Sequence, residues 1–183
     1  GGIPVCWPQF GSLALEGMVQ HGFARMMPFD VKGTQYSEDM TEITLAIASS
    51  PETKRLWPFD FELEVTISVS MKLNLKMETR NTGEKEFEFT CGFHPYFLTR
   101  DRDSVAVRGL DSVPFVDATD MSEHVQSGDL EMTSAADRVY SLPPAPKHEF
   151  ALVDPLLRRA IAMVSSGNAS AVVWKCLSLS HAA

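Results

Sequence analysis

The chain has 183 residues, 44% of them hydrophobic and 22% charged, and it carries a formal net charge of −8 at pH 7. This composition is typical of a folded domain that is long enough to bury a core. The negative charge disfavours nucleic acid and anionic membranes as main partners, although a local group of Arg and His side chains can still bind one phosphorylated metabolite.

Targeting signals are missing from the sequence. No run approaches the roughly 18 apolar residues of a transmembrane helix, and the opening Gly-Gly-Ile-Pro lacks the basic and apolar regions of a signal peptide. The three cysteines, Cys6, Cys91 and Cys176, stand far apart in apolar settings without metal-ligand spacing. We therefore predict buried free thiols in a reducing compartment and a cytoplasmic protein.

The first segment in chain order, Gly1–Arg25, is rich in Gly, Pro and aromatic residues and predicts an irregular, well-packed loop. It supplies Gln20, His21 and Arg25 within six positions. A guanidinium offers a planar fork of donors to phosphate oxygens, and an amide binds hydroxyls, so the three suit an anionic sugar ligand. The alternative is that His21 and Arg25 only satisfy buried carbonyls of the loop.

Strands dominate the rest of the chain. Polar and apolar residues alternate in four successive segments separated by short turns, as in antiparallel strands with one buried face: Thr41–Ala48, Phe61–Val69, Met71–Met77 and Phe87–Phe93. Shorter strands are predicted at Ser104–Val107, Glu149–Val153, Ile161–Val164 and Ala171–Trp174. Ser134–Tyr140 is interpreted as a single turn, and no segment predicts an amphipathic helix with caps.

These patterns predict an all-β fold, an antiparallel β-sandwich that forms a single domain over residues 1–183. A sandwich that begins at Gly1 and ends at Ala183 would leave open sheet edges. We therefore expect a domain truncated at both ends.

His94 follows the strongest strand pattern, in the stretch CGFHPYFL. A rigid sheet presents a side chain at a strand end to a cleft, and imidazole titrates near neutrality, which makes His94 a candidate general acid. The alternative is a histidine at the edge of the core that is bonded to a backbone carbonyl. His124, His148 and His181 are interpreted as surface residues.

Asp137 stands in the stretch AADRVY, where its carboxylate could accept hydrogen bonds from sugar hydroxyls. Alternatively it caps a turn or pairs with Arg138. No set of side chains has metal-ligand spacing, so no metal is expected. Because the sequence also lacks a phosphate-binding Gly-rich loop and a nucleophile elbow, no nucleotide cofactor is expected either.

Several stretches, in this order along nearly the whole chain, resemble the glucose-6-phosphate 1-epimerase family. The most specific are GGIPVCWPQFG at 1–11 and QHGFAR at 20–25; the others are RLWPFDFELEVTISV at 55–69, NTGEKEFEFTCGFHPYF at 81–97, VRGLDSVPFVD at 107–117, ADRVY at 136–140 and AVVWK at 171–175. The resemblance implies a galactose mutarotase-like supersandwich and a cofactor-independent isomerase that interconverts the α and β anomers of a hexose 6-phosphate. A monomer is expected.

The resemblance also implies roles for single residues. His94 corresponds to the catalytic acid that protonates the ring oxygen. Gln20 and Arg25 match ligand-binding positions, with Arg25 on the phosphate, while Asp137 holds sugar hydroxyls and His21 lines the pocket.

The sequence departs from the family in two places. The family has an Arg directly before GGIP, and its general base is a Glu in a C-terminal strand well beyond AVVW. No Glu of this chain matches that position. Two alternatives therefore stay open: a sugar-phosphate-binding module without catalysis, and a mutarotase of unphosphorylated aldoses, which the Arg of QHGFAR disfavours.

Overall fold

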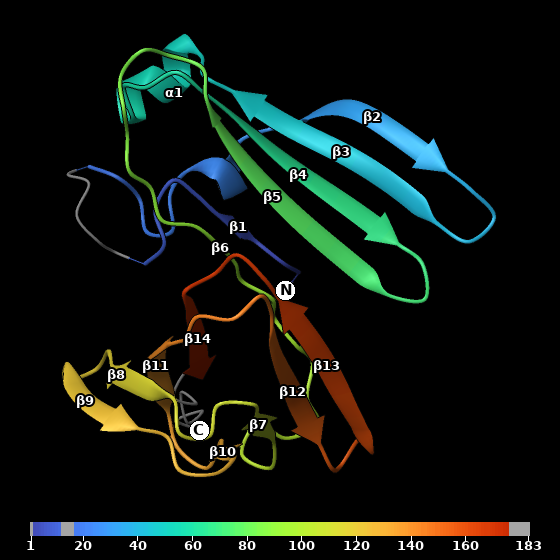
Figure 1. The fold of residues 1–183 in the computed structure, drawn as a ribbon, viewed down its shortest axis with the longest axis vertical. Helices are drawn as coiled ribbons and strands as arrows, with labels where there is room; N and C mark the ends of the chain where they lie inside the picture. The colour runs from blue at the N-terminus through green and yellow to red at the C-terminus, as the bar shows by residue number, and fades with distance from the viewer. Residues whose placement is uncertain (1, 12–16, 176–183) are drawn as a thin grey trace, which may run out of the picture. The chain divides into compact units, whose positions relative to one another are not determined.

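The computed structural model describes residues 2–11 and 17–175 (Figure 1). The chain divides into two compact units, residues 1–96 and residues 97–183. These are the first unit and the second unit.

The first unit is built on one long antiparallel sheet. Its strands follow one another in chain order (Figure 1) as β2 (Asp30–Tyr36), β3 (Thr41–Ala48), β4 (Phe61–Val69) and β5 (Leu73–Asn81). A second, two-stranded ladder joins β1 (Val5–Cys6) to β6 (Gly92–Phe93). Alternation along β4 buries Phe61, Leu63 and Val65. The strands predicted at Thr41–Ala48 and Phe61–Val69 are confirmed with the predicted bounds.

Two strand predictions in the first unit need correction. The strand predicted at Met71–Met77 begins instead at Leu73, because residues 70–72 form the hairpin turn. The strand predicted at Phe87–Phe93 is wrong for all but Gly92 and Phe93. Thr90 donates its N–H to the carbonyl of Pro8, but Pro8 has no N–H to return the bond, so the ladder ends there.

The core of the first unit is aromatic. Trp7 is fully buried and packs against Phe61 and Trp57, with ring centroids 4.5 and 5.1 Å apart. Its indole N–H donates to Thr79 Oγ1 at 3.0 Å, so the polar edge of the ring is also satisfied. The segment before Pro8 is thereby fixed to the sheet.

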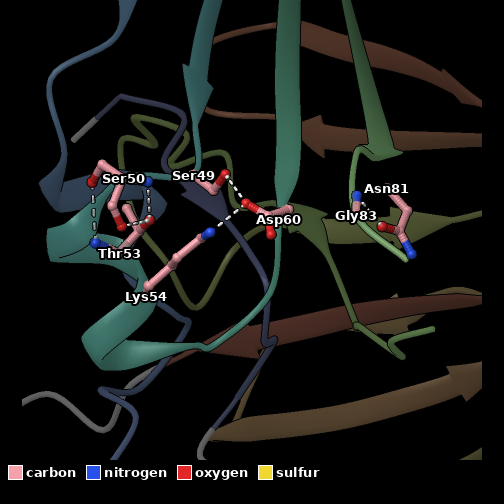
Figure 2. A network of polar contacts seen from close by, with 7 residues as sticks. All are labelled: Ser49, Ser50, Thr53, Lys54, Asp60, Asn81 and Gly83. Atoms are coloured by element: carbon pink, nitrogen blue, oxygen red, sulfur yellow. Dashed lines mark hydrogen bonds and ion pairs between the residues drawn. The ribbon is translucent and has the colours of Figure 1, made fainter. Parts of the chain in front are cut away.

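The sequence reading missed a short helix, α1 (Pro51–Leu56). Ser50 accepts the Thr53 N–H through its hydroxyl at 3.2 Å, and Thr53 Oγ1 accepts the Ser50 N–H at 2.8 Å. Figure 2 shows this reciprocal pair beside Asp60, which accepts from Ser49 Oγ at 3.0 Å and pairs with Lys54 at 2.5 Å. In residues 2–11 and 17–175, no helix is long and apolar enough to span a bilayer.

Replacing Ser50 by Ala is expected to lower the free energy of unfolding by about 1 kcal/mol, because the N–H of Thr53 loses its acceptor at the first turn of α1. Urea denaturation followed by circular dichroism measures the change. Ser50→Asp is the matched control, since its carboxylate also accepts at an N-cap, and it should stay within a few tenths of a kcal/mol of the wild type. Equal losses in both variants would contradict the capping role.

The second unit contains two four-stranded antiparallel sheets, ordered β10-β7-β12-β13 and β14-β11-β8-β9. Their strands are β7 (Ala106–Arg108), β8 (Pro114–Asp117), β9 (Ser122–Val125), β10 (Leu130–Glu131), β11 (Ala136–Ser141), β12 (His148–Asp154), β13 (Arg159–Ser165) and β14 (Ser170–Lys175). Leu152 of the first sheet and Phe115 and Tyr140 of the second belong to one buried cluster, so the two sheets enclose a common core.

The strands predicted in this half of the chain are confirmed with shifts of one or two residues at their ends. The turn predicted at Ser134–Tyr140 is wrong, because Ala136–Ser141 is strand β11, between β8 and β14. Tyr140 is fully buried there and donates its hydroxyl to Gln126 Oε1 at 2.9 Å. With antiparallel sheets in both units, the predicted all-β fold is confirmed.

The two described cysteines differ in exposure. Cys6 is buried, as predicted, and burial raises the pKa of its thiol. Cys91 is exposed, which corrects the prediction of a buried thiol, because the segment before Gly92 runs outside the regular ladder. Cys176 lies outside the described residues.

Candidate active site around His21 and His94

The QHGFAR segment lies directly against the backbone of the buried Trp7. Gly22 has a φ of +70°, and a Cβ on this residue would lie 2.1 Å from the Trp7 carbonyl oxygen. The same oxygen accepts the N–H of Ala24 at 3.1 Å. Only glycine allows both the left-handed conformation and this close approach. The segment is therefore fixed on the core, and the 3-10 helix Ala24–Met26 that follows carries Arg25.

His21 is bound twice to one residue of the opposite loop. Its N–H donates to the Gly11 carbonyl at 2.8 Å, and its ring Nδ1 accepts the Gly11 N–H at 3.0 Å. Since a nitrogen that accepts a hydrogen bond carries no proton, the ring hydrogen lies on Nε2 and the ring is uncharged.

The surroundings of His21 also favour the uncharged ring. Partial burial lowers the pKa of His21, and the nearby Arg25 and His94 lower it further. Protonation of Nδ1 would break the bond from Gly11. A lowered pKa means that the unfolded chain binds the proton more readily. The uncharged His21 ring therefore contributes its full stabilisation of the fold at pH values above the ordinary imidazole pKa. This stabilisation is lost as the pH falls through the lowered pKa of His21 in the folded chain.

His94 follows β6 and is half-buried. Its N–H donates to the Pro4 carbonyl at 3.0 Å, which extends the pairing with the first loop. Its ring stacks on Tyr96 with centroids 4.6 Å apart at 10°, and it meets the His21 ring edge to face at 5.4 Å. The structure thus brings together the two histidines that the sequence singled out, from positions 73 residues apart.

Arg25 is exposed and donates from Nη2 to the backbone carbonyl of Gln20 at 2.7 Å. This bond uses one of the five donors of the guanidinium, so the fork keeps donors for an anion. Gln20 is also exposed, and it contributes its carbonyl, not its amide, to this contact. His21, His94 and Arg25 therefore form one group in the first unit, with Gln20 beside it.

Asp137 belongs to the second unit. It is half-buried in β11, opposite Trp174 of β14, and its carbonyl accepts the Ala118 N–H at 2.7 Å. The predicted role of its carboxylate stays a prediction.

The other residues considered from the sequence do not add to the group of His21, His94 and Arg25. Residues 2–11 and 17–175 contain no group of three or more His, Cys, Asp or Glu side chains that could hold a metal ion. His124 is exposed and His148 is half-buried, while His181 lies outside the described residues. Sequence reasoning missed Phe10 and Gly11 as neighbours of the two histidines, although both stand in the quoted PQFG motif.

Each unit also has a surface depression. One, of about 240 Å³ in the second unit, is lined by Phe115, Asp117, His124, Val125, Gln126, Ser127 and Arg138. The other, of about 530 Å³ in the first unit, is lined by Trp57, Phe59, Asn81, Glu86, Phe87 and Glu88. The larger one presents two carboxylates and no basic side chain, which does not suit a phosphate. The histidines and Arg25 therefore remain the predicted ligand site.

Comparison with known proteins identifies the family of this chain. The sequence model of the family described as Aldose 1-epimerase matches residues 1–178. The curated protein named "Putative glucose-6-phosphate 1-epimerase" of Escherichia coli (strain K12) is 34% identical over 176 residues, which cover 95% of this chain and 57% of that protein. A protein of the same name from Cenchrus ciliaris is 30% identical over 185 residues, covering 95% and 55%. The chain thus spans less than two thirds of the length of these relatives.

A solved structure supports both family and fold. The crystal structure described as a "putative mutarotase" from Salmonella typhimurium matches with a TM-score of 0.85 and 33% identity, over 95% of this chain and 57% of that one. A galactose mutarotase-like protein from Lactobacillus casei ATCC 334 matches with a TM-score of 0.73 at 21% identity, over 94% of this chain and 67% of that one, and supports the fold alone. The expected galactose mutarotase-like fold is confirmed, and the chain belongs to the aldose 1-epimerase family.

Proposed function

We propose that the protein is a hexose-6-phosphate mutarotase, an isomerase that interconverts α and β anomers, with glucose 6-phosphate as the expected substrate. The observation that carries the proposal is the grouping of two imidazoles with Arg25, close enough that Arg25 lowers the pKa of His21. Imidazoles supply acid and hydrogen-bond chemistry to a sugar ring, and a guanidinium beside them suits the phosphate. The names of the curated relatives support the same substrate.

The proposed reaction needs a proton donor and a proton acceptor. His94 gives a proton to the ring oxygen while a base takes the proton of the anomeric hydroxyl, so the bond between the anomeric carbon and the ring oxygen breaks and an open-chain aldehyde forms. Rotation about one carbon–carbon bond and reclosure on the other face, with both protons returned, invert the anomeric centre. No net atom or electron is gained or lost, so the reaction consumes no oxidant or reductant, and we propose that it proceeds without a cofactor or metal.

The remaining residues supply binding. Arg25 on the phosphate and Gln20 on hydroxyls would hold parts of the sugar that do not react, and binding energy there orients the reacting carbon. The carboxylate of Asp137, in the second unit, stays a predicted partner of sugar hydroxyls. We propose a cytoplasmic monomer that acts on this small molecule, with no nucleic acid or membrane partner.

A second candidate function is a sugar-phosphate-binding module without catalysis. Such a module would bind the sugar phosphate with the same predicted binding residues but leave the two anomers at their spontaneous rate of exchange. A mutarotase of unphosphorylated aldoses is the third candidate, and it would make no use of Arg25.

Exchange spectroscopy on the α and β anomers of glucose 6-phosphate separates these functions. We expect the protein to accelerate exchange of glucose 6-phosphate above the spontaneous rate and to act less on glucose, which lacks the group for Arg25. Arg25→Met should remove that preference by weakening binding of the phosphate. Binding of glucose 6-phosphate without accelerated exchange would favour the module, and equal acceleration with glucose would contradict the phosphate specificity.

A further inference from the structure

The side chain and the backbone of His21 both bind the backbone of Gly11. The two hydrogen bonds between His21 and Gly11 close a ring of contacts in which each residue gives one N–H and takes one. Both residues have left-handed backbones, with φ of +65° at His21 and +78° at Gly11. A non-glycine residue rarely adopts this conformation, so the paired bonds hold His21 in a position it would not take alone.

The turn that supplies Gly11 is itself held on both sides. Phe10 donates its N–H to Thr90 Oγ1 at 2.8 Å. Gln9 is buried, with 3% of its surface exposed, and its amide donates to the Gly11 carbonyl at 3.4 Å. A Cβ on Gly92 would lie 3.0 Å from the Phe10 ring, so glycine there leaves the ring its place.

The Phe10 ring touches both histidines. Its centroid lies 5.0 Å from that of His21, edge to face, and 6.4 Å from that of His94, nearly parallel at 22°. Among the described residues, Arg25 and His94 are the chargeable groups that act on His21, and both oppose a positive charge on its ring. The turn therefore sets the orientation of His21, and its surroundings keep the ring neutral.

We propose that the Gln9–Gly11 turn is a positioning element that fixes His21 as an uncharged hydrogen-bond donor. The Gly11 amide occupies Nδ1, so the Nε2 hydrogen is the only polar group that the ring presents to a ligand, here an oxygen of the sugar phosphate. His21 then donates to the ligand but exchanges no proton with it, and proton transfer belongs to His94. The inference rests on the proposed function for the identity of the ligand.

Nitrogen NMR on the full chain labelled with ¹⁵N tests the positioning without any turnover. We expect His21 to show a single neutral tautomer protonated at Nε2 at pH 7, and a coupling across the hydrogen bond between the Gly11 amide nitrogen and Nδ1. His124, which is exposed in the second unit, is the internal reference. A His21 ring protonated at Nδ1, or charged at pH 7, would overturn the proposal.

Two substitutions test the donor role. His21→Asn keeps an acceptor near Nδ1 and tolerates the positive φ, but it has no donor at the place of Nε2. His21→Gln places its terminal amide near Nε2 instead. Calorimetric titration with glucose 6-phosphate should show about tenfold weaker binding for His21→Asn, the loss of one hydrogen bond, with His21→Gln recovering part of it.

The NMR measurement and the binding measurement have separate outcomes. Wild-type affinity in a folded His21→Asn variant would overturn the donor role. If the wild-type chain bound no glucose 6-phosphate, the proposed function would fail, whereas the tautomer and the coupling to Gly11 would still be measured. If His21→Asn does not fold, the NMR result on the wild type decides the inference alone.

Discussion

Replacing Gly22 by Ala is expected to destabilise the first unit by about 4 kcal/mol, which is a large part of the stability of an ordinary domain. The new Cβ would meet the Trp7 carbonyl oxygen at 2.1 Å, the Trp7 carbonyl carbon at 2.4 Å and the Pro8 nitrogen at 2.8 Å. All three are backbone atoms next to a fully buried indole, so none can rotate away. About 1–2 kcal/mol of the expected loss comes from the left-handed conformation, which Ala adopts less readily than Gly.

Gly17 offers a matched control for Gly22→Ala. It has nearly the same conformation, with a φ of +77°, but a Cβ there meets no atom of residues 2–11 and 17–175 within 4 Å. Gly17→Ala should therefore cost only the conformational part, about 1–2 kcal/mol. Urea denaturation of both variants gives the two free energies of unfolding. If Gly22→Ala cost no more than Gly17→Ala, the close approach between QHGFAR and Trp7 would be wrong.

The parts of the fold that the sequence predicted are those whose pattern reports burial. β4 alternates because one face packs on the core, β3 shows the same alternation of polar and apolar residues in its sequence, and both were predicted with the correct bounds. β2 has seven exposed residues and no alternation, so nothing in DVKGTQY announces a strand. β2 is held in the sheet by backbone hydrogen bonds to β3, and these bonds do not depend on a particular side-chain pattern.

The errors have physical causes of the same kind. The alternation in Phe87–Phe93 is real, but it places Phe87 against Trp57, with centroids 4.6 Å apart, and not on a sheet face. Helix α1 is too short for amphipathic periodicity, and its start is marked by Ser50 and Thr53 where the usual signature has Glu or Gln. A local cap can thus define an element that no periodicity reveals.

The candidate site divides in the same way. Motifs identified His21, His94 and Arg25, but only the structure shows that the two imidazoles meet at 5.4 Å. The bond from the Gly11 amide to His21 Nδ1 joins loop positions ten residues apart, and it depends on two left-handed residues. Sequence types do not encode such a bond, although it decides which ring nitrogen faces a ligand.

Replacing His94 by Gln is expected to reduce the accelerated exchange of glucose 6-phosphate anomers by at least about 10²-fold, because an amide can donate a hydrogen bond but cannot deliver a proton to the ring oxygen. His94→Ala should lose as much, and it also removes the stacking on Tyr96. Exchange spectroscopy gives the rates. Calorimetric titration gives the affinity, which should change much less, since Arg25 and not His94 is proposed to hold the phosphate.

A large loss of exchange rate with little loss of affinity would identify His94 as a proton donor, and not as a ring that only supports the loop. His124→Gln is the matched control, since that imidazole is exposed in the second unit and takes no part in the proposed chemistry. Exchange that persists in His94→Gln would remove His94 from the mechanism. If the exchange rate and the affinity fell together, His94 would instead be a binding residue. The proton donor would then have to be a group other than either histidine, because the bond from the Gly11 N–H to Nδ1 leaves His21 uncharged.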